Sequence, residues 1–140
     1  MQTSKLFVDT SGWMAYLVVG EGQHAQAVQE IDHALDDASI AIYTTDHILA
    51  ELVALMQARR LPRAHILRDV NGLLIAPKIT KLYTDEALYL AAWNVLMHRT
   101  GKGWSLADAI SILRMQEFGM TEALTTDHHF EQAGFVRLLA

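Results

Sequence analysis

Apolar residues along the chain follow two different spacings, and each spacing predicts a different kind of element. Short continuous apolar runs that end at polar or turn residues are typical of buried strands. Such runs predict strands over residues 6–8, 39–43, 73–76 continuing to 79–83, 122–126 and 135–139.

Stretches with apolar residues three and four positions apart alternate with these runs and predict helices. The helices are predicted from about residue 13, then over 23–37, 47–60, 63–74, 84–99 and 104–117, with a last helical turn before residue 134. Strands that alternate with helices in this way form right-handed crossovers and a mostly parallel sheet. The predicted fold class is therefore α/β, a three-layer α/β/α arrangement around a mostly parallel central sheet.

Length and composition are those of one globular domain that covers residues 1–140. Hydrophobic residues make up 51% of the chain and charged residues 19%, which excludes a disordered chain. No apolar run approaches the roughly 20 residues that cross a bilayer, and the first residues lead directly into a strand, so neither a membrane partner nor a signal peptide is expected. Cysteine is absent, which excludes disulfides and thiolate metal sites. These features favour a cytoplasmic protein, and the net charge of −5 argues against a general polyanion binder.

Four acidic residues occupy related places in this pattern. Asp9 ends the first strand, and Asp127 repeats the arrangement of strand, hydroxyls and carboxylate near the end of the chain. Glu51 lies early in the helix after the second strand, and Asp108 lies in the first turn of a later helix. Strand-to-helix turns of a parallel sheet meet at one edge, where α/β proteins bind their ligands. We therefore expect the four carboxylates to converge there.

Each acid also has a purely structural interpretation. Asp9 could act only as the cap of the helix that follows it. Ser105 and Asp108 have the spacing of a capping box. Glu51 shares a helix face with apolar neighbours, where an unpaired carboxylate is costly, but it could lie at the edge of that face and reach water.

Convergence of the acids would favour a cation. Two carboxylates ~5 Å apart repel by roughly 3 kcal/mol at an effective dielectric of 20. Four of them would raise one another's pKa values or require a positive ion. Oxygen ligands without cysteine favour Mg²⁺ or Mn²⁺, and such a site suits phosphoryl chemistry with direct attack by water.

Two further features bear on partners. A basic corner contains four arginines, and a loop over residues 100–103 adds one lysine; such charges form either a solvated face or a phosphate-binding edge. These candidate RNA-binding residues are Arg59, Arg60, Arg63, Arg68 and Lys102. The helix over 84–99 is apolar nearly all round, which predicts that it is covered on more than one side, one of which could be a second subunit.

Taken in order, these motifs resemble the PIN domain, and in length they are similar to the VapC-like toxin ribonucleases of toxin–antitoxin modules. The matching segments are Phe7-Val8-Asp9-Thr10-Ser11, Leu49-Ala50-Glu51-Leu52, Leu106-Ala107-Asp108-Ala109-Ile110 and Leu124-Thr125-Thr126-Asp127.

The resemblance implies an endoribonuclease that depends on Mg²⁺ or Mn²⁺ and hydrolyses RNA phosphodiester bonds with metal-activated water. It places the catalytic and metal-binding roles on Asp9, Glu51, Asp108 and Asp127, and supporting roles on Thr10, Ser11 and Thr126. It also implies a homodimer that a cognate antitoxin silences. His128 and His129 stand where the family often has Arg or Lys, which leaves the RNA-contacting role of this corner open.

Other classes fit less well. A haloacid-dehalogenase-type phosphatase needs a second Asp where this chain has Ser11, and a response-regulator receiver needs an acidic pair after its first strand. The DHH phosphoesterases are much longer, although Asp127 and the two histidines after it spell their motif. The alternative that stays open is a non-catalytic PIN-like subunit that binds RNA or protein; missing acids would favour it, and all four are present.

Overall fold

A five-stranded sheet lies at the centre of the computed structural model, which describes residues 4–99, 101 and 103–140. The strand order is β3-β2-β1-β4-β5, and every neighbouring pair is parallel. The strands are β1 Ser4–Val8, β2 Ile40–Thr45, β3 Ile79–Leu82, β4 Glu122–Leu124 and β5 Val136–Arg137.

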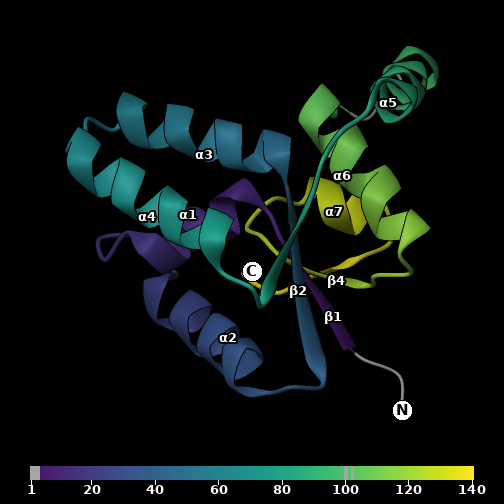
Figure 1. Ribbon diagram of the computed structural model, residues 1–140. Helices are drawn as coiled ribbons and strands as arrows, with labels where there is room; N and C mark the ends of the chain where they lie inside the picture. Colours follow the sequence, from purple (N-terminus) through teal and green to yellow (C-terminus); the bar gives the residue numbers. More distant parts are fainter. Residues whose placement is uncertain (1–3, 100, 102) are drawn as a thin grey trace.

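Helices cover both faces of this sheet. Helices α1 to α4 lie on one side and α5 to α7 on the other (Figure 1). The α/β class and the three-layer parallel arrangement predicted from the sequence are confirmed. The helices are α1 Thr10–Leu17, α2 His24–Asp36, α3 Asp46–Ala58, α4 Arg63–Ile75, α5 Glu86–His98, α6 Leu106–Glu117 and α7 His129–Gln132.

The first strand occupies the middle of the sheet, which explains why it is a continuous apolar run. β1 pairs with β2 on one side and β4 on the other, and Phe7 and Val8 are completely buried. Trp13 of α1 is also fully buried, and its indole N–H donates to the Thr44 hydroxyl at 3.0 Å. That hydroxyl donates in turn to the carbonyl of Val8 at 3.0 Å, so α1 is fixed directly over the ends of β1 and β2.

Helix α4 corrects one prediction. The apolar run over 73–76 was expected to begin a strand, but Leu73–Ile75 form the last turn of α4, which also runs through Asn71 and Gly72. Ile66, Val70 and Leu73 face the core at helical spacing, whereas Leu74 and Ile75 are exposed. Helical burial of one face therefore overrides the local strand preference. The strand begins only at Ile79.

Helix α5 packs on α6 rather than on the sheet. Ala92 is buried against Ala109 and Ile110, and Leu88, Val95, Leu96, Leu106 and Leu113 extend this contact. Among the described residues, only this side of α5 is covered, so the prediction of cover on more than one side does not hold for one copy of the chain. Within residues 4–99, 101 and 103–140, no helix is both long and apolar enough to cross a membrane.

Candidate active site

The four acids gather at one cavity of about 580 Å³ at the carboxyl ends of β1 and β4. The expected convergence is therefore observed, because each acid follows a strand or lies in the first two turns of a helix at the same edge of the parallel sheet. The cavity is lined by Asp9, Thr10, Ser11, Glu51, Leu55, Ser105, Asp108, Thr126, Asp127 and His128.

Asp9 stands at the N-cap position of α1, but its carboxylate does not cap the helix. Instead, Oδ2 accepts a hydrogen bond from the hydroxyl of Thr125 at 3.0 Å. The backbone N–H of Asp9 donates to the carbonyl of Leu124 at 3.2 Å, which ties the end of β1 to the end of β4. The interpretation of Asp9 as a simple helix cap is thus wrong.

A chain of hydroxyls supports Asp9. The Ser11 and Thr125 hydroxyl oxygens are 3.0 Å apart, and the backbone N–H of Thr126 donates to Ser11 Oγ at 3.0 Å. The backbone N–H of Asp127 donates to Thr125 Oγ1 at 3.0 Å. Since Thr125 gives its own proton to Asp9, Ser11 is the donor in the first contact. One buried threonine thereby connects two of the acids.

Glycine at position 12 permits this arrangement. A Cβ added to Gly12 would lie 2.2 Å from the carbonyl oxygen of Leu124 and 3.0 Å from its carbonyl carbon. Both contacts are with backbone at the end of β4, which cannot rotate away. Only glycine therefore lets α1 approach β4 closely enough for the two loops to share their hydroxyls.

Glu51 reaches the cavity from the second turn of α3. This helix begins at Asp46, with Thr45 as its N-cap. The hydroxyl of Thr10 donates to Glu51 Oε1 at 2.9 Å. Ile48 and Leu52 are buried beside it, but Glu51 itself is exposed at the rim of the cavity. Glu51 therefore lies at the edge of the apolar helix face, as its purely structural interpretation predicts, and it also belongs to the acid cluster.

Asp108 serves two purposes. Its backbone N–H donates to Ser105 Oγ, and its Oδ2 accepts from the backbone N–H of Ser105, each at 3.0 Å, which completes a capping box. The same Oδ2 lies 2.8 Å from Nδ1 of His129. The capping-box interpretation is correct, but it does not exclude a place in the cavity.

His129 joins two of the acids. Its ring Nδ1 contacts Asp108 and also lies 3.2 Å from Asp127 Oδ1, while its backbone N–H donates to the same Oδ1 at 2.9 Å. Asp127 is fixed by the start of α7 in this way, and α6 is tied to α7 through the ring. His128 is more exposed, with Nδ1 3.8 Å from Asp127 Oδ1.

Two of the four acids, Asp9 and Glu51, lie where their surroundings oppose ionisation. The pKa of the Asp9 carboxyl is raised from its ordinary 3.8 to about 7, and burial is the largest cause. Hydrogen bonds from the Thr10 backbone and the Thr125 hydroxyl oppose this rise, and the nearby charges of Glu51 and Asp108 contribute to it. Burial also raises the pKa of Glu51, and the charges of Asp108 and Asp127 add to the effect.

This donor set fits a hard divalent cation. Carboxylate and hydroxyl oxygens are the ligands that Mg²⁺ and Mn²⁺ prefer. Among the described residues that line the cavity, none is a lysine or an arginine that could neutralise the carboxylates. The ligand atoms of Asp127, His128 and His129 also lie within 4.8 Å of one another. A cation held by the acids would favour the ionised form of Asp9 and Glu51 and so offset the burial and the neighbouring charges that raise the pKa values of these two groups.

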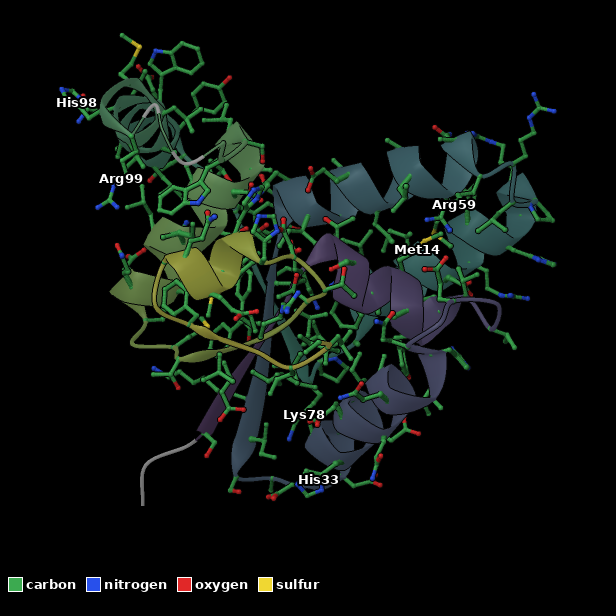
Figure 2. The ribbon with its side chains drawn as sticks, turned by 180° about the vertical axis from the view of Figure 1, so that it is seen from behind. Met14, His33, Arg59, Lys78, His98 and Arg99 are labelled. Atoms are coloured by element: carbon green, nitrogen blue, oxygen red, sulfur yellow. The ribbon has the colours of Figure 1, made fainter. Side chains whose placement is uncertain are left out.

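The basic corner lies apart from the acids. Arg59 ends α3, well beyond Glu51 along the helix, and the three other arginines lie on the following turn and on α4. Arg59 lines a second cavity of about 210 Å³, which shares Ser11, Leu55 and Thr126 with the acid cavity. Figure 2 shows Arg59 at this end of the molecule, near Met14 of α1 and far from His98 and Arg99 at the end of α5. Lys102 lies outside the described residues.

Two residues that contact the acids were not predicted as part of the site. Thr125 makes the contact with Asp9, whereas the predicted Thr126 lines the cavity and uses its backbone N–H toward Ser11. The sequence shows two threonines after the apolar strand residues 123–124, and it does not show which of the two faces Asp9. No local signal marks His129, since its contact with Asp108 spans two helices that meet only in the folded chain.

This fold and this cluster of acids define a PIN domain. A model of the PIN domain family matches residues 6–136, and the chain belongs to that family.

Several named proteins and solved structures are similar to this chain. The chain is 28% identical over 133 residues to the 23S rRNA-specific endonuclease VapC20 of Mycobacterium tuberculosis, a match covering 95% of this chain and 97% of the relative. A crystal structure of that VapC20, described as a Sarcin-Ricin loop cleaving toxin, superposes with a TM-score of 0.82 at 25% identity, covering 94% of this chain and 96% of the other. A VapC ribonuclease of Archaeoglobus fulgidus is 27% identical over 111 residues, 79% of this chain and 69% of the relative. FitAcB from Neisseria gonorrhoeae shares the fold, with a TM-score of 0.63 at 21% identity over 94% of each chain.

Proposed function

We propose that this protein is a divalent-metal-dependent endoribonuclease, the toxin of a toxin–antitoxin pair, which acts on RNA in the cytoplasm. One observation carries the proposal: four carboxylates from four separate segments of a PIN domain line one cavity. The relatives that are named endonuclease and ribonuclease support the same reaction.

Asp9, Glu51, Asp108 and Asp127 would hold the ion, which is Mg²⁺ or Mn²⁺. When bound, the ion would lower the pKa of a water molecule and neutralise charge that develops on the leaving oxygen of the phosphodiester.

The protein's own groups prepare the carboxylates for that task. Thr125 and the Ser11 hydroxyl behind it fix the orientation of Asp9, and the Thr10 hydroxyl fixes Glu51. All of the hydrogen bonds that the described residues make to the Asp108 carboxylate fall on Oδ2, which leaves Oδ1 free to face an ion. Such supporting contacts set the geometry of metal ligands and tune their affinity.

The substrate would follow the two connected cavities. A single RNA strand cleaved at the acids would continue past Leu55 and Thr126 toward Arg59. Arg59 would contact a phosphate there. The remaining members of the basic corner, together with Lys102, would attract the strand through long-range charge rather than at the reacting phosphate.

Two protein partners complete the proposal. The outer face of α5 exposes large apolar side chains, which suits an isologous contact between two copies of the chain. These residues are Tyr89, Leu90, Trp93 and Met97. The second partner is a cognate antitoxin that would cover the acid cavity and so inhibit the enzyme.

The deciding experiment measures RNA cleavage by the purified protein with Mn²⁺, with Mg²⁺ and with EDTA. We expect cleavage that needs metal and that Asp9→Asn or Asp108→Asn abolishes while circular dichroism stays unchanged. Asp36→Asn, an exposed carboxylate on α2, is the matched control and keeps activity. Inclusion of 23S ribosomal RNA among the substrates tests the class that VapC20 is named for.

Growth provides the second arm. Expression of the wild-type chain alone should arrest a bacterial host, and coexpression of the small neighbouring gene should relieve the arrest. A folded protein that binds no metal and leaves every RNA intact would instead support a non-catalytic PIN-like binding subunit.

A further inference from the structure

His47 forms a bridge between the two helices that carry Glu51 and Asp108. It lies in the first turn of α3, with 18% of its side chain exposed. Its Nε2 is 3.1 Å from the carbonyl oxygen of Ala107, the residue before Asp108. Its Nδ1 is 2.9 Å from the hydroxyl of Thr45.

The partners of the ring determine its tautomer. A carbonyl oxygen only accepts, so Nε2 carries the proton that bonds to Ala107. In the neutral ring Nδ1 is then an acceptor and takes the hydroxyl proton of Thr45. The Thr45 oxygen accepts in turn from the backbone N–H of Ile48 at 3.2 Å, as the N-cap of α3. The ring is therefore held from both sides, and burial lowers the pKa of His47 in agreement with a neutral ring.

This contact matters because α3 and α6 belong to different layers. The two helices lie on opposite sides of the sheet (Figure 1), so Glu51 and Asp108 reach the cavity from separate supports. His47 reaches across to the first turn of α6, and Ser111 one turn further along α6 lies 3.4 Å from the same Nε2. The bridge fixes the separation of the two helix starts and, with it, the separation of the two carboxylates.

We propose that His47 is a positioning residue that holds the first turn of α6 against α3 and thereby sets Asp108 at the right distance from Glu51 to share a divalent cation. The inference rests on the proposed function, since it assumes that both acids bind the ion. Metal ligands tolerate displacements of only a fraction of an ångström, and loss of such supporting contacts weakens metal binding by roughly 10- to 100-fold.

Two amide substitutions test the two hydrogen bonds of the His47 ring separately. The side-chain nitrogen of glutamine lies as many bonds from Cα as Nε2 of histidine, so His47→Gln keeps a donor for Ala107. The amide of asparagine matches Nδ1 instead, so His47→Asn keeps only the contact with Thr45. His47→Leu fills the space and donates to neither partner, and His33→Asn on the exposed side of α2 is the control.

The experiment measures the Mn²⁺ affinity of the full-length chain by calorimetry, at a temperature below the melting point of every variant. We expect about 10-fold or weaker Mn²⁺ binding for His47→Asn and His47→Leu, and near wild-type affinity for His47→Gln and His33→Asn. A general loss of stability would affect the glutamine and asparagine variants alike and would not produce this order.

Each outcome decides the question. Wild-type affinity in a folded His47→Asn or His47→Leu variant overturns the proposal. If both of these variants fail to fold, His47→Gln decides alone, and weakened Mn²⁺ binding in that variant overturns it. A wild-type protein that binds no Mn²⁺ contradicts the proposed function. If Asp108→Asn loses Mn²⁺ binding while every His47 variant keeps it, only the role of His47 is contradicted.

Discussion

The hydroxyl of Thr125 donates a hydrogen bond of 3.0 Å to Oδ2 of Asp9, and it joins the ends of the two central strands β1 and β4. The same oxygen accepts the backbone N–H of Asp127. Thr125 is completely buried, so removal of its hydroxyl takes one hydrogen-bond partner away from Asp9 and from the backbone N–H of Asp127 inside the protein. One side chain therefore supports two acids from opposite ends of the sequence.

Thr125→Val keeps the shape of the side chain and removes this support. We expect a loss of about 1–3 kcal/mol in stability and of roughly 10- to 100-fold in metal affinity. The hydroxyl lowers the pKa of Asp9, so the pH midpoint of metal binding should move upward in the variant. Titration calorimetry with Mn²⁺ at several pH values measures both effects.

Thr126→Val is the matched control for this prediction. Thr126 lines the same cavity, but its hydrogen bonds to Ser11 and Arg137 are made by its backbone, so the substitution leaves them in place. Equal effects of the two substitutions would show that the hydroxyl of Thr125 has no special role.

These two threonines show how far the sequence alone could reach. The order of strands and helices predicted a parallel sheet, and the topology of such a sheet predicted that acids at strand ends would meet. The sequence could not predict where β4 ends, because Thr125 and Thr126 both suit a strand or a turn. Which hydroxyl faces Asp9 depends on that end and on the approach of Gly12 to Leu124.

The contacts of His47 and His129 were beyond prediction for a different reason. Each histidine bonds to a helix that is distant along the chain, and neither has a local pattern that announces its partner. The run Leu73–Ile75 was misassigned because its apolar residues suit a strand locally, whereas its place on the buried face of α4 is set by packing. The local sequence pattern determines which segments form helices or strands. Tertiary contacts determine where these segments end and which side chains connect them.

Asp9 should make the metal-free protein less stable as the pH rises. Its pKa is about 7 in the folded chain against an ordinary 3.8, so the folded state binds this proton more tightly than the unfolded state. The stabilising effect of that proton is complete below about pH 4 and is lost as the pH rises through about 7. In EDTA, Asp9→Asn should therefore raise the melting temperature at pH 8 by about 5 °C and give no such gain at pH 4.

Thermal melts across this pH range check the sign. The control Asp36→Asn, on the exposed side of α2, should not show the gain between pH 4 and 8. Added Mg²⁺ should stabilise the wild type at pH 8 and not Asp9→Asn, because the ion binds the ionised carboxylate. A gain of the same size for Asp9→Asn at both pH values would contradict the burial of a charge at this position.

Gly12 and Gly72 should respond to alanine in opposite directions. The new Cβ at position 12 would lie 2.2 Å from the Leu124 carbonyl oxygen, so Gly12→Ala must push α1 away from β4. We expect a loss of about 3 kcal/mol or more, together with loss of metal binding as Ser11 separates from Thr125. Gly72 lies inside α4 with nothing within 4 Å of an added Cβ, so Gly72→Ala should stabilise by roughly 0.5–1 kcal/mol. Urea denaturation measures both changes, and a stable Gly12→Ala variant would show that α1 does not need this close approach.

The outer face of α5 should be the contact between two copies of the chain. Trp93 is 51% exposed on this face, and Leu67 on α4 is 50% exposed elsewhere, so the two form a matched pair. We expect the wild type and Leu67→Glu to be dimers by light scattering, and Trp93→Glu to be a monomer, because a buried charge would remain unpaired at the contact. A dimer that survives Trp93→Glu would assign the contact to another surface.

Arg59 should bind RNA in competition with Glu21. The two side chains form an ion pair beside the cavity that continues from the acids, so an RNA phosphate must replace the Glu21 carboxylate. Arg59→Gln should therefore weaken the binding of a single-stranded RNA, and Glu21→Gln should strengthen it by freeing the guanidinium. Both are measured by fluorescence anisotropy in an Asp108→Asn background, which prevents cleavage.

Arg59→Gln should also lower the slope of log affinity against log salt by about 0.7, the value of one phosphate contact on a single strand. Arg68→Gln is the control, since Arg68 pairs with Asp69 on α4 and lines neither cavity. If Arg59→Gln and Arg68→Gln weaken binding equally, the arginines act through general charge, and the strand does not follow the groove to Arg59.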